Sequence, residues 1–416
     1  MGWGRGKYGT IAAMQATGTF AAAALAILVS AVCDMAANAE TFNMNADWRF
    51  SWAKETIPLK QALASMEKGG VAVTDPAYDD ADWELVSVPH PVNAHDSFDG
   101  HAVDPGEASF RRGMMFYRKR FALPRGTGNG ERGTGKSFLT FETVRQTIYV
   151  WVNGKFAGYY EAGVAPTAYD VTALLKPGEN VVCVATDNTA MRGTKVFALE
   201  TRPGHEPGDM SGEGWQWNTT DFNEVQGGLV GNVSLVAKPS RTYLTLPYYN
   251  NLKTVGTYVT AKDFDFAKGE ATICVRAEVR NEDSSRGGAE ARRFKIKAEV
   301  REAGTTGTAG TTGTKSLVSV VSPVLDVPSS PSNVFLTALE SDVYEPSPAP
   351  TRVVSPETAF IEAECRAAGL VFWSPDTPHL YDVEVSLVDE NGAVLDRETV
   401  RTGFREVKFD AAKGGL

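Results

Sequence analysis

The sequence predicts an all-β protein built from two antiparallel β-sandwiches. Many short segments alternate between apolar and polar residues, and Gly, Pro and Asn separate these segments. Helical periodicity is nearly absent outside the N-terminus and a short stretch at Lys60–Glu67. Short strands punctuated by turn residues are typical of antiparallel sandwiches. The chain has 416 residues, which is enough for two or three domains of ordinary size.

Residues 1–39 have the features of a secretory signal peptide. Arg5 and Lys7 give a positive start, and an apolar run of 13 residues follows at Phe20–Val32. Ala37-Asn38-Ala39 matches the small-residue pattern of a cleavage site. We therefore expect cleavage after its last alanine and a secreted or periplasmic mature chain. The alternative is an uncleaved membrane anchor, but the run is shorter than the ~20 residues of a span.

The first sandwich is expected over residues 40–239. Thr147–Val152 is rich in β-branched and aromatic residues, Asn153-Gly154 follows, and Lys155–Gly158 continues the pattern. Two strands joined by Asn-Gly are the strongest short-range signal for a β-hairpin. The Gly-rich stretch Arg125–Gly135 is expected to be a loop. Further strands are expected at Ser137–Val144, Asn180–Ala185 and Gly231–Ala237.

The second sandwich is expected over residues 240–405. Ala271–Val279 and Tyr381–Val388 alternate as strands do, and Asn391-Gly392 predicts a hairpin turn before Val394–Arg401. Residues 303–356 interrupt this pattern with a repeat of Ala, Gly and Thr and then a stretch rich in Pro and Ser. Strand patterns resume on both sides, so we expect a disordered loop between strands rather than a domain boundary.

The composition excludes several classes of protein. The formal net charge is −10, which argues against a nucleic-acid partner. Four cysteines exclude a disulfide scaffold. The mature chain would keep Cys183, Cys274 and Cys365, which allows one disulfide at most, with the last two the favoured pair; we expect no bridge. Five histidines leave little material for a metal site, and we expect neither a metal nor a cofactor.

Gly130–Ser137 matches the phosphate-loop pattern G-x-x-x-x-G-K-S. That loop needs a buried strand before it and a helix after it, so that backbone amides and the helix N-terminus surround the phosphate. Here a proline and several glycines precede the pattern, and Ser137–Val144 alternates as a strand does. We therefore predict a glycine-rich hairpin loop and no nucleotide binding.

Six groups of motifs follow one another along the first sandwich. They are Trp48-Arg49-Phe50; Tyr78–Trp83 with Val88-Pro89-His90; Phe116–Phe121; Val150–Gly154; Tyr169–Thr172 with Gly178-Glu179-Asn180; and Gly227-Gly228-Leu229 with Asn232-Val233. In this order they resemble the sugar-binding domain of family 2 glycoside hydrolases, the group of β-galactosidases, β-glucuronidases and β-mannosidases. Gly231 stands where that family usually has arginine. The resemblance implies a jelly-roll (galactose-binding-like) sandwich.

The resemblance continues through the second sandwich. Trp373–Tyr381 is similar to the family's W-x-P-x-x-P-x-L-Y segment, and Gly403-Phe404-Arg405 matches the G-F-R that closes its immunoglobulin-like domain. Most of the matching residues are expected to specify the fold. We predict core positions for Trp48, Trp83, Trp151 and Tyr117, and turn or bridging roles for Asp79, Asp80, Asp170 and Asn180.

The catalytic domain of the family follows the G-F-R strand. Retaining glycosidases need two carboxyl groups about 5 to 5.5 Å apart, and the resemblance places both glutamates on a (β/α)₈ barrel. Residues 406–416 resemble the approach to that barrel, and no βαβα pattern occurs in the chain. We therefore assign no catalytic residue. The chain is expected to be the inactive N-terminal portion of a retaining β-glycosidase, with the barrel as its intramolecular partner.

The first sandwich is still expected to contact a carbohydrate. In the family, an aspartate on the loop before the G-G-I strand contacts the terminal sugar, and Asp221 and Asn223 occupy that position here. Trp215 and Trp217 lie in a Gly-rich acidic loop nearby, where exposed indoles can stack on a sugar ring. A solvated loop, or packing against the barrel, remains the alternative for these residues.

Two other classes of function stay open. One is a stand-alone secreted carbohydrate-binding protein of two modules without hydrolase activity. The other is a structural adhesion or assembly module that binds no sugar. The sequence separates neither galactoside from glucuronide or mannoside nor one oligomeric state from another, although the loops are nearest to those of β-galactosidases.

Overall fold

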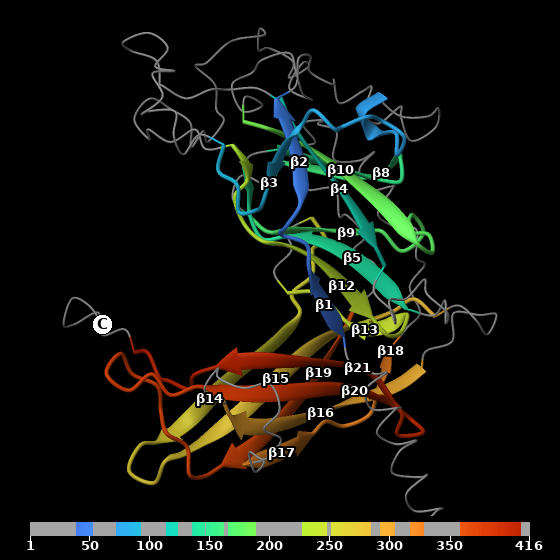
Figure 1. The fold of residues 1–416 in the computed structure, drawn as a ribbon. Helices are drawn as coiled ribbons and strands as arrows, with labels where there is room; N and C mark the ends of the chain where they lie inside the picture. Colours follow the sequence, from blue (N-terminus) through green and yellow to red (C-terminus); the bar gives the residue numbers. More distant parts are fainter. Residues whose placement is uncertain are drawn as a thin grey trace, which may run out of the picture.

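The computed structural model describes residues 39–52, 72–92, 114–123, 135–145, 147–161, 165–188, 227–247, 251–283, 292–303, 317–327 and 358–408. These residues form two β-sandwiches, one above the other in Figure 1. Apart from a 3₁₀ turn at Ala72–Thr74 they contain strands and no α-helix, which confirms the predicted all-β fold. None of them forms a helix long and apolar enough to cross a membrane. The predicted signal peptide and the predicted helical stretch at Lys60–Glu67 fall outside these ranges.

The first sandwich consists of a six-stranded and a four-stranded antiparallel sheet. The six-stranded sheet has the order β3-β2-β4-β10-β7-β8, with β3 at Glu84–Val86, β2 at Trp48–Trp52, β4 at Met114–Ala122, β10 at Glu179–Asp187, β7 at Thr147–Val152 and β8 at Lys155–Glu161. The four-stranded sheet has the order β1-β12-β5-β9, with β1 at Glu40–Asn43, β12 at Val233–Lys238, β5 at Lys136–Phe141 and β9 at Thr167–Asp170. A further pair, β6 (Val144–Arg145) and β11 (Gly228–Leu229), lies beside them.

Alternate residues of the two sheets form one apolar core. Trp48, Tyr117 and Val150 point inward from the large sheet and meet Phe141 and Leu235 from the small sheet. The predicted hairpin is confirmed, because β7 and β8 pair through a turn in which Asn153 and Gly154 have φ of 52° and 79°. Positive φ at both central residues is the geometry that gives a two-residue turn the twist of its strands.

The second sandwich also has two antiparallel sheets. One contains β13 (Thr242–Leu244), β14 (Thr257–Asp265), β15 (Glu270–Asn281) and β19 (Ala359–Ala367). The other contains β16 (Arg292–Glu302), β17 (Val318–Val321), β18 (Leu325–Val327), β20 (Tyr381–Asp389) and β21 (Val394–Thr402). Its core is built mainly from Val, Ile, Ala and Leu residues of both sheets, together with a few aromatics.

Two of these strands correct the predicted disordered loop at residues 303–356. β17 and β18 lie within that range, and both pair with β16. Val320 is buried in the core of the second sandwich. The prediction was wrong for residues 317–327, because their short alternating pattern was outweighed by the low-complexity composition on either side. Asn391-Gly392 does turn the chain between β20 and β21, as predicted, within a four-residue loop that ends in a register shift.

The two sandwiches share a buried interface. The chain passes from the first to the second between β12 and β13, and the outer face of the four-stranded sheet rests on the second sandwich (Figure 1). Phe138, Ala168 and Val236 of the first sandwich pack against Tyr243 and Leu246 of the second. Apolar contact of this kind makes a fixed arrangement of the two domains more stable than a freely jointed one.

Two buried lysines of the first sandwich form ion pairs with the second. Lys238 Nζ lies 3.0 Å from Asp396 Oδ2 and 3.8 Å from Glu398 Oε2. Lys136 Nζ lies 2.6 Å from Glu282 Oε2 and also contacts Asp170. Lys136 is the lysine of the phosphate-loop pattern, and the following residues form strand β5 rather than a helix. The predicted strand after the pattern is confirmed. The lysine forms ion pairs with carboxylates of the protein itself.

The three described cysteines are free, as expected. Cys365 lies opposite Ile273 and packs against the core, whereas Cys274 lies opposite Glu364 on the outer face of the same sheet. Neighbouring residues of paired strands that point to opposite faces cannot form a disulfide.

The thiols are expected to differ in reactivity. Burial raises the pKa of Cys183 to about 12, so the thiolate that reacts with disulfide reagents is scarcely populated at pH 8. Burial and the charge of Glu364 also raise the pKa of Cys274, but this thiol is accessible to solvent; titration of the folded mature chain with a chromogenic disulfide should therefore leave Cys183 unmodified while Cys274 reacts. In guanidinium chloride all three should react. A single reactive thiol in denaturant would instead mean that a disulfide exists.

Candidate functional site

The four predicted sugar-contacting residues, Asp221, Asn223, Trp215 and Trp217, lie outside the described residues. The structure does describe both ends of the segment that carries them. Asn188 follows β10, and Gly227 precedes β11. A Cβ on Gly227 would lie 2.8 Å from Asn188 Nδ2, so the segment leaves and re-enters the first sandwich at one place.

A second segment leaves and returns at the same place. The Val92 amide donates a hydrogen bond to the Gly227 carbonyl at 3.1 Å, and residues 93–113 then separate Val92 from the start of β4 at Met114. A Cβ on Gly227 would lie 3.0 Å from Met115 Cε. We call this edge, formed by residues 90–92, 114–117, 187–188 and 227–229, the rim. Ligand sites of sandwich folds are commonly built from loops gathered at one end of the scaffold.

Glycine is required where the first of these segments, residues 189–226, re-enters the sandwich. Gly228 has φ of +99°, a conformation that side chains disfavour. A Cβ there would lie 2.4 Å from the Tyr117 hydroxyl and 2.8 Å from the His90 carbonyl oxygen. The Gly-Gly motif thus brings the returning chain directly onto the buried face of the rim. Gly231 is similarly confined, because a Cβ would lie 2.6 Å from the Thr143 amide nitrogen, so this backbone leaves no room for a side chain.

The half-buried His90 and the fully buried Tyr117 form a polar pair at the rim. His90 Nδ1 lies 3.0 Å from the Tyr117 hydroxyl, and the His90 amide donates to the Leu229 carbonyl at 2.7 Å. Burial lowers the pKa of His90, although the charge of Glu84 opposes the shift. Burial also raises the pKa of Tyr117 well above its usual range. Both groups are therefore neutral near pH 7, and they hold the rim by hydrogen bonds rather than by charge.

This pair predicts a specific acid sensitivity. Because the folded-state pKa of His90 is depressed, the unfolded chain binds more protons below about pH 6.5. Stability is therefore lost as the pH falls through 6.5 toward the folded-state value. The variant His90→Gln keeps a neutral polar side chain and removes the titration. Urea unfolding between about pH 7.5 and 5.5 should show a shallower decline for this variant, and parallel declines would refute the assignment.

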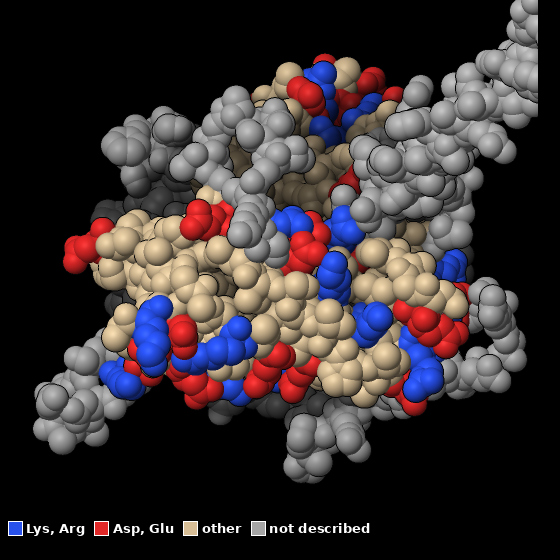
Figure 2. Space-filling model, turned by 90° about the horizontal axis from the view of Figure 1, so that it is seen from below, with Lys and Arg blue, Asp and Glu red and all other residues tan. Residues whose placement is uncertain are grey.

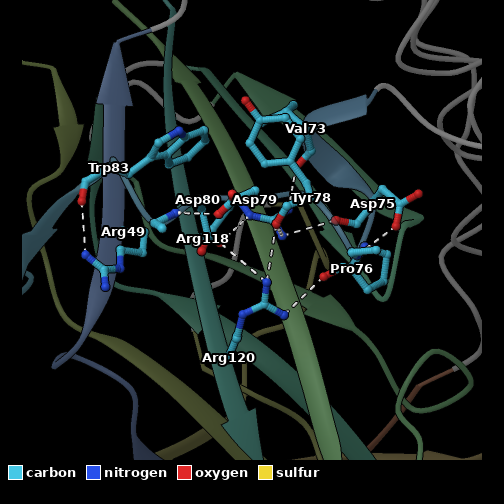
Figure 3. A network of polar contacts seen from close by, with 12 residues as sticks. Arg49, Val73, Asp75, Pro76, Tyr78, Asp79, Asp80, Trp83, Arg118 and Arg120 are labelled. Carbon is cyan, nitrogen blue, oxygen red and sulfur yellow. Dashed lines mark hydrogen bonds and ion pairs between the residues drawn. The ribbon is translucent and has the colours of Figure 1, made fainter.

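The acidic motif of the first sandwich is structural, as predicted. Asp80 Oδ2 accepts a hydrogen bond from Arg118 Nε at 2.7 Å, and Asp79 Oδ1 accepts one from the Ala81 amide at 3.1 Å. Figure 3 shows Arg118 and Arg120 reaching from β4 to the backbone of residues 73–78. The segment is thereby fastened over the outer face of the large sheet, where Trp83 packs on Phe116.

The other predicted structural positions are as expected except that of Trp83, which packs on the outer side of the sheet instead of lying in the core. Trp48, Trp151 and Tyr117 are fully buried, whereas Trp83 is half-buried. Asp170 accepts a hydrogen bond from the Thr172 amide, and Asn180 bonds to the backbone of residues 176 and 178. In these positions side-chain oxygens and amides satisfy backbone groups that the turns leave unpaired.

The two motifs of the second sandwich meet in space. The Trp373 amide donates to the Phe404 carbonyl at 2.8 Å, and the Arg405 guanidinium lies 4.7 Å from the centre of the Trp373 ring. A Cβ on Gly403 would lie 2.7 Å from that ring. The G-F-R sequence is explained by this contact, because glycine admits the indole and arginine covers it.

The carboxylates buried between the two sandwiches form ion pairs or hydrogen bonds with lysines, a threonine hydroxyl and backbone amides. Asp396 and Glu398 share Lys238, Asp170 and Glu282 share Lys136, and Glu278 accepts hydrogen bonds from Thr245 Oγ1 and two backbone amides. The described residues contain no group of three His, Cys, Asp or Glu side chains placed to hold a metal ion. On the face seen in Figure 2, basic and acidic side chains are interspersed over the described residues rather than gathered by sign.

Comparison with known proteins relates both sandwiches to one group of enzymes. Residues 42–205 match the family model described as glycosyl hydrolases family 2, sugar binding domain, and residues 336–405 match the model described as glycosyl hydrolases family 2. A β-glucuronidase of Formosa agariphila is 34% identical over 247 residues, which cover 58% of this chain and 21% of that protein. A β-galactosidase of Alteromonas mediterranea is 23% identical over 380 residues, 90% of this chain and 28% of that protein.

Solved structures agree in fold. A β-glucuronidase from glycoside hydrolase family 2 superimposes with a TM-score of 0.59 at 24% identity over 88% of this chain and 30% of its own. A putative β-galactosidase of Bacteroides fragilis gives 0.55 at 20% identity, over 89% of this chain and 42% of its own. The chain therefore spans between about a fifth and two-fifths of the length of these proteins.

Proposed function

The chain belongs to glycoside hydrolase family 2, and from this premise we propose that it forms the non-catalytic, sugar-binding N-terminal part of a secreted β-glycosidase. The whole protein would release terminal β-linked sugars. The chain covers only 21% and 28% of the lengths of the β-glucuronidase and β-galactosidase that it matches. The catalytic nucleophile and the acid/base residue would come from a barrel domain. The buried carboxylates between the two sandwiches are not available for these roles, because they form ion pairs with lysines or accept hydrogen bonds from backbone amides.

The rim is the part of the chain that we propose to contact substrate. The observation that carries this proposal is the placement of Gly227-Gly228 against Tyr117 and His90. The segment bearing Asp221, Asn223, Trp215 and Trp217 therefore joins the first sandwich directly beside the buried Tyr117. Asp221 and Asn223 would hydrogen-bond vicinal hydroxyls of the terminal sugar, and the two indoles would stack on a sugar ring or on the barrel.

Secretion is part of the proposal. It is supported by the sequence alone: a positive start, an apolar run at Phe20–Val32 and the Ala37-Asn38-Ala39 pattern precede the first described strand, which begins at Glu40. N-terminal sequencing of the protein recovered from its native host should give Glu40 as the first residue, and an intact Met1 would exclude cleavage.

The enzymatic proposal is tested with two forms of the protein. Residues 40–416 alone should not hydrolyse fluorogenic β-galactosides, β-glucuronides or β-mannosides. The same chain extended through the reading frame downstream of codon 416 should hydrolyse one of them. In that extended protein, Asp221→Ala should lower kcat/KM at least about tenfold, the loss of one well-made polar contact to substrate. The exposed Asp376→Ala in the second sandwich is the matched control and should change kcat/KM less than twofold.

The alternative is a stand-alone secreted carbohydrate-binding protein. It predicts a stop codon after residue 416, no hydrolase activity in any form, and sugar binding by residues 40–416 that Asp221→Ala abolishes. The order of family motifs through both sandwiches favours the hydrolase. A downstream stop codon together with sugar binding would decide for the alternative.

A further inference from the structure

A depression of about 530 Å³ lies on the outer face of the sheet that contains β16, β17, β20 and β21. It belongs to the second sandwich, whereas the rim belongs to the first (Figure 1). Alternate residues of a strand share one face, so Lys295, Lys297, Glu299 and Arg301 of β16 project into it together. Its volume is within the range of small-molecule sites in proteins.

The charges of this depression are unbalanced. Four cations, Lys295, Lys297, Arg301 and Arg397, face two carboxylates, Glu299 and Glu384, which gives a local charge of 4 − 2 = +2. The whole chain carries −10. A basic depression on an acidic protein concentrates anions by its local field.

Most of these groups are already fixed in position. Lys297 Nζ lies 2.8 Å from Glu299 Oε1, and Arg301 contacts both Glu299 and Glu384. The pKa of Glu299 is lowered chiefly by its hydrogen bond to Lys297. Lys295, by contrast, forms no ion pair with any carboxylate in the described part of the chain. Among the described residues Lys295 is thus the cation without a carboxylate partner, and Lys297, next to it on the same face of β16, shares its one carboxylate, Glu299, with Arg301.

The part of the depression around these two lysines is also lined with aliphatic side chains. Val388 pairs with Lys295 across β20, Val321 pairs with Lys297 across β17, and Val394 lines the depression beside Val388. Val321 is 55% exposed. Aliphatic carbon next to ammonium groups complements a pyranose ring that carries a carboxylate: the C–H face packs on valine, and the carboxylate accepts charge-assisted hydrogen bonds. Glu384 and Ser386 also line the depression, but Arg301 and Arg397 already bind Glu384, and Arg397 Nε donates a hydrogen bond to Ser386 Oγ.

We propose that this depression binds uronate units of an anionic polysaccharide, with Lys295 and Lys297 as the carboxylate-binding pair. Such a site would hold the polymer to the enzyme at a distance from the rim. The choice of a carbohydrate rests on the proposed function, while the choice of an anionic one rests on the charge and lining of the depression.

The test uses residues 40–416 and calorimetric or NMR titration with an oligoglucuronate of four to six units. A neutral gluco-oligosaccharide of the same length is the comparison ligand. The oligoglucuronate should bind at least about tenfold more tightly, and its affinity should fall severalfold between 50 and 300 mM salt because the contact is ionic. The double variant Lys295→Ala/Lys297→Ala should weaken binding at least tenfold.

The matched control is Lys262→Ala/Lys268→Ala, which removes two exposed lysines from β14 and the turn after it in the other sheet. It should change the affinity less than twofold. Equal losses in both double variants, equal affinity for the neutral ligand, or no binding at 10 mM oligoglucuronate would each overturn the proposal. Binding through Lys295 and Lys297 in a protein whose extended form hydrolyses no glycoside would support this site and overturn the proposed function. Hydrolysis with no effect of the lysine variants would do the reverse.

Discussion

Replacing Lys238 by methionine should lower the free energy of unfolding by about 3–5 kcal/mol, the cost of breaking a buried ion pair from one side. Lys238 and Asp396 are 2% and 0% exposed, and Glu398 is 20% exposed. Methionine fills the space of the lysine stem but leaves two carboxylates facing each other without their cation. Urea unfolding at pH 7, followed by tryptophan fluorescence, measures the change. Because the pair joins the two sandwiches, the loss should also separate the transition into two steps.

The pH dependence of this variant identifies the cause of the loss. Burial raises the pKa of Asp396 and of Glu398, and the charge of Lys238 opposes both shifts. A carboxyl group whose pKa is higher in the folded than in the unfolded state binds its proton more tightly in the folded state. Its contribution to the free energy of unfolding is fully present below the unfolded-state pKa of about 4 and is lost as the pH rises through the folded-state pKa. Without Lys238 both shifts grow. The difference between wild type and variant should therefore shrink as the pH falls from 7 toward 4.

A matched control separates burial from charge. Lys262 forms a 2.7 Å ion pair with Glu364, but the two side chains are 50% and 53% exposed. Lys262→Met should cost less than about 1 kcal/mol, as exposed ion pairs do. The double variant Lys238→Met/Asp396→Asn should recover part of the loss, since it removes one of the uncompensated charges. Similar losses in the Lys238 and Lys262 variants would show that Lys238 holds no buried ion pair.

Replacing Arg118 by methionine is the second change with a large expected effect, again about 3–5 kcal/mol. The guanidinium is fully buried. It donates hydrogen bonds to the Asp80 carboxylate and to the carbonyls of Val73 and Asp75. It also lies 5.3 Å from the centre of the Tyr78 ring (Figure 3). Methionine would leave the Val73 carbonyl without its donor, and among the described cations it would leave Asp80 with only the half-exposed Arg120, 3.8 Å away. Urea unfolding measures the loss, and the near-ultraviolet circular dichroism of Trp83 reports whether the covering segment is released.

Arg120 provides the control for this prediction on the same strand. It binds the carbonyls of Pro76 and Tyr78, so it contacts the same segment, but its side chain is 40% exposed. Arg120→Met should cost less than about 1 kcal/mol because water replaces its partners. Losses that agree within about 1 kcal/mol for the two arginine variants would contradict the role given to burial.

Local signals in the sequence predicted the strands and many of the turns. The Asn153-Gly154 hairpin, the alternating strands and the turn roles of Asp79, Asp170 and Asn180 each depend on residues a few positions apart. Such features follow from backbone geometry and side-chain hydrogen bonding within one segment. Val318–Val321 was missed because its four residues carry too little alternation to stand out beside a repeat of Gly and Thr.

The sequence by itself determined the all-β class, the two sandwiches and the family, because each follows from short patterns and their order along the chain. Only the tertiary structure decided which charged residues are buried. Lys238 and Asp396 are 158 positions apart. Nothing in the local sequence around either residue indicates that its side chain is buried. The contact between His90 and Tyr117, 27 positions apart, and the depression around the lysines of β16 also depend on the tertiary structure, because strand pairing brings distant segments together. Burial is a property of what packs on a residue, and strand pairing between distant segments supplies that packing.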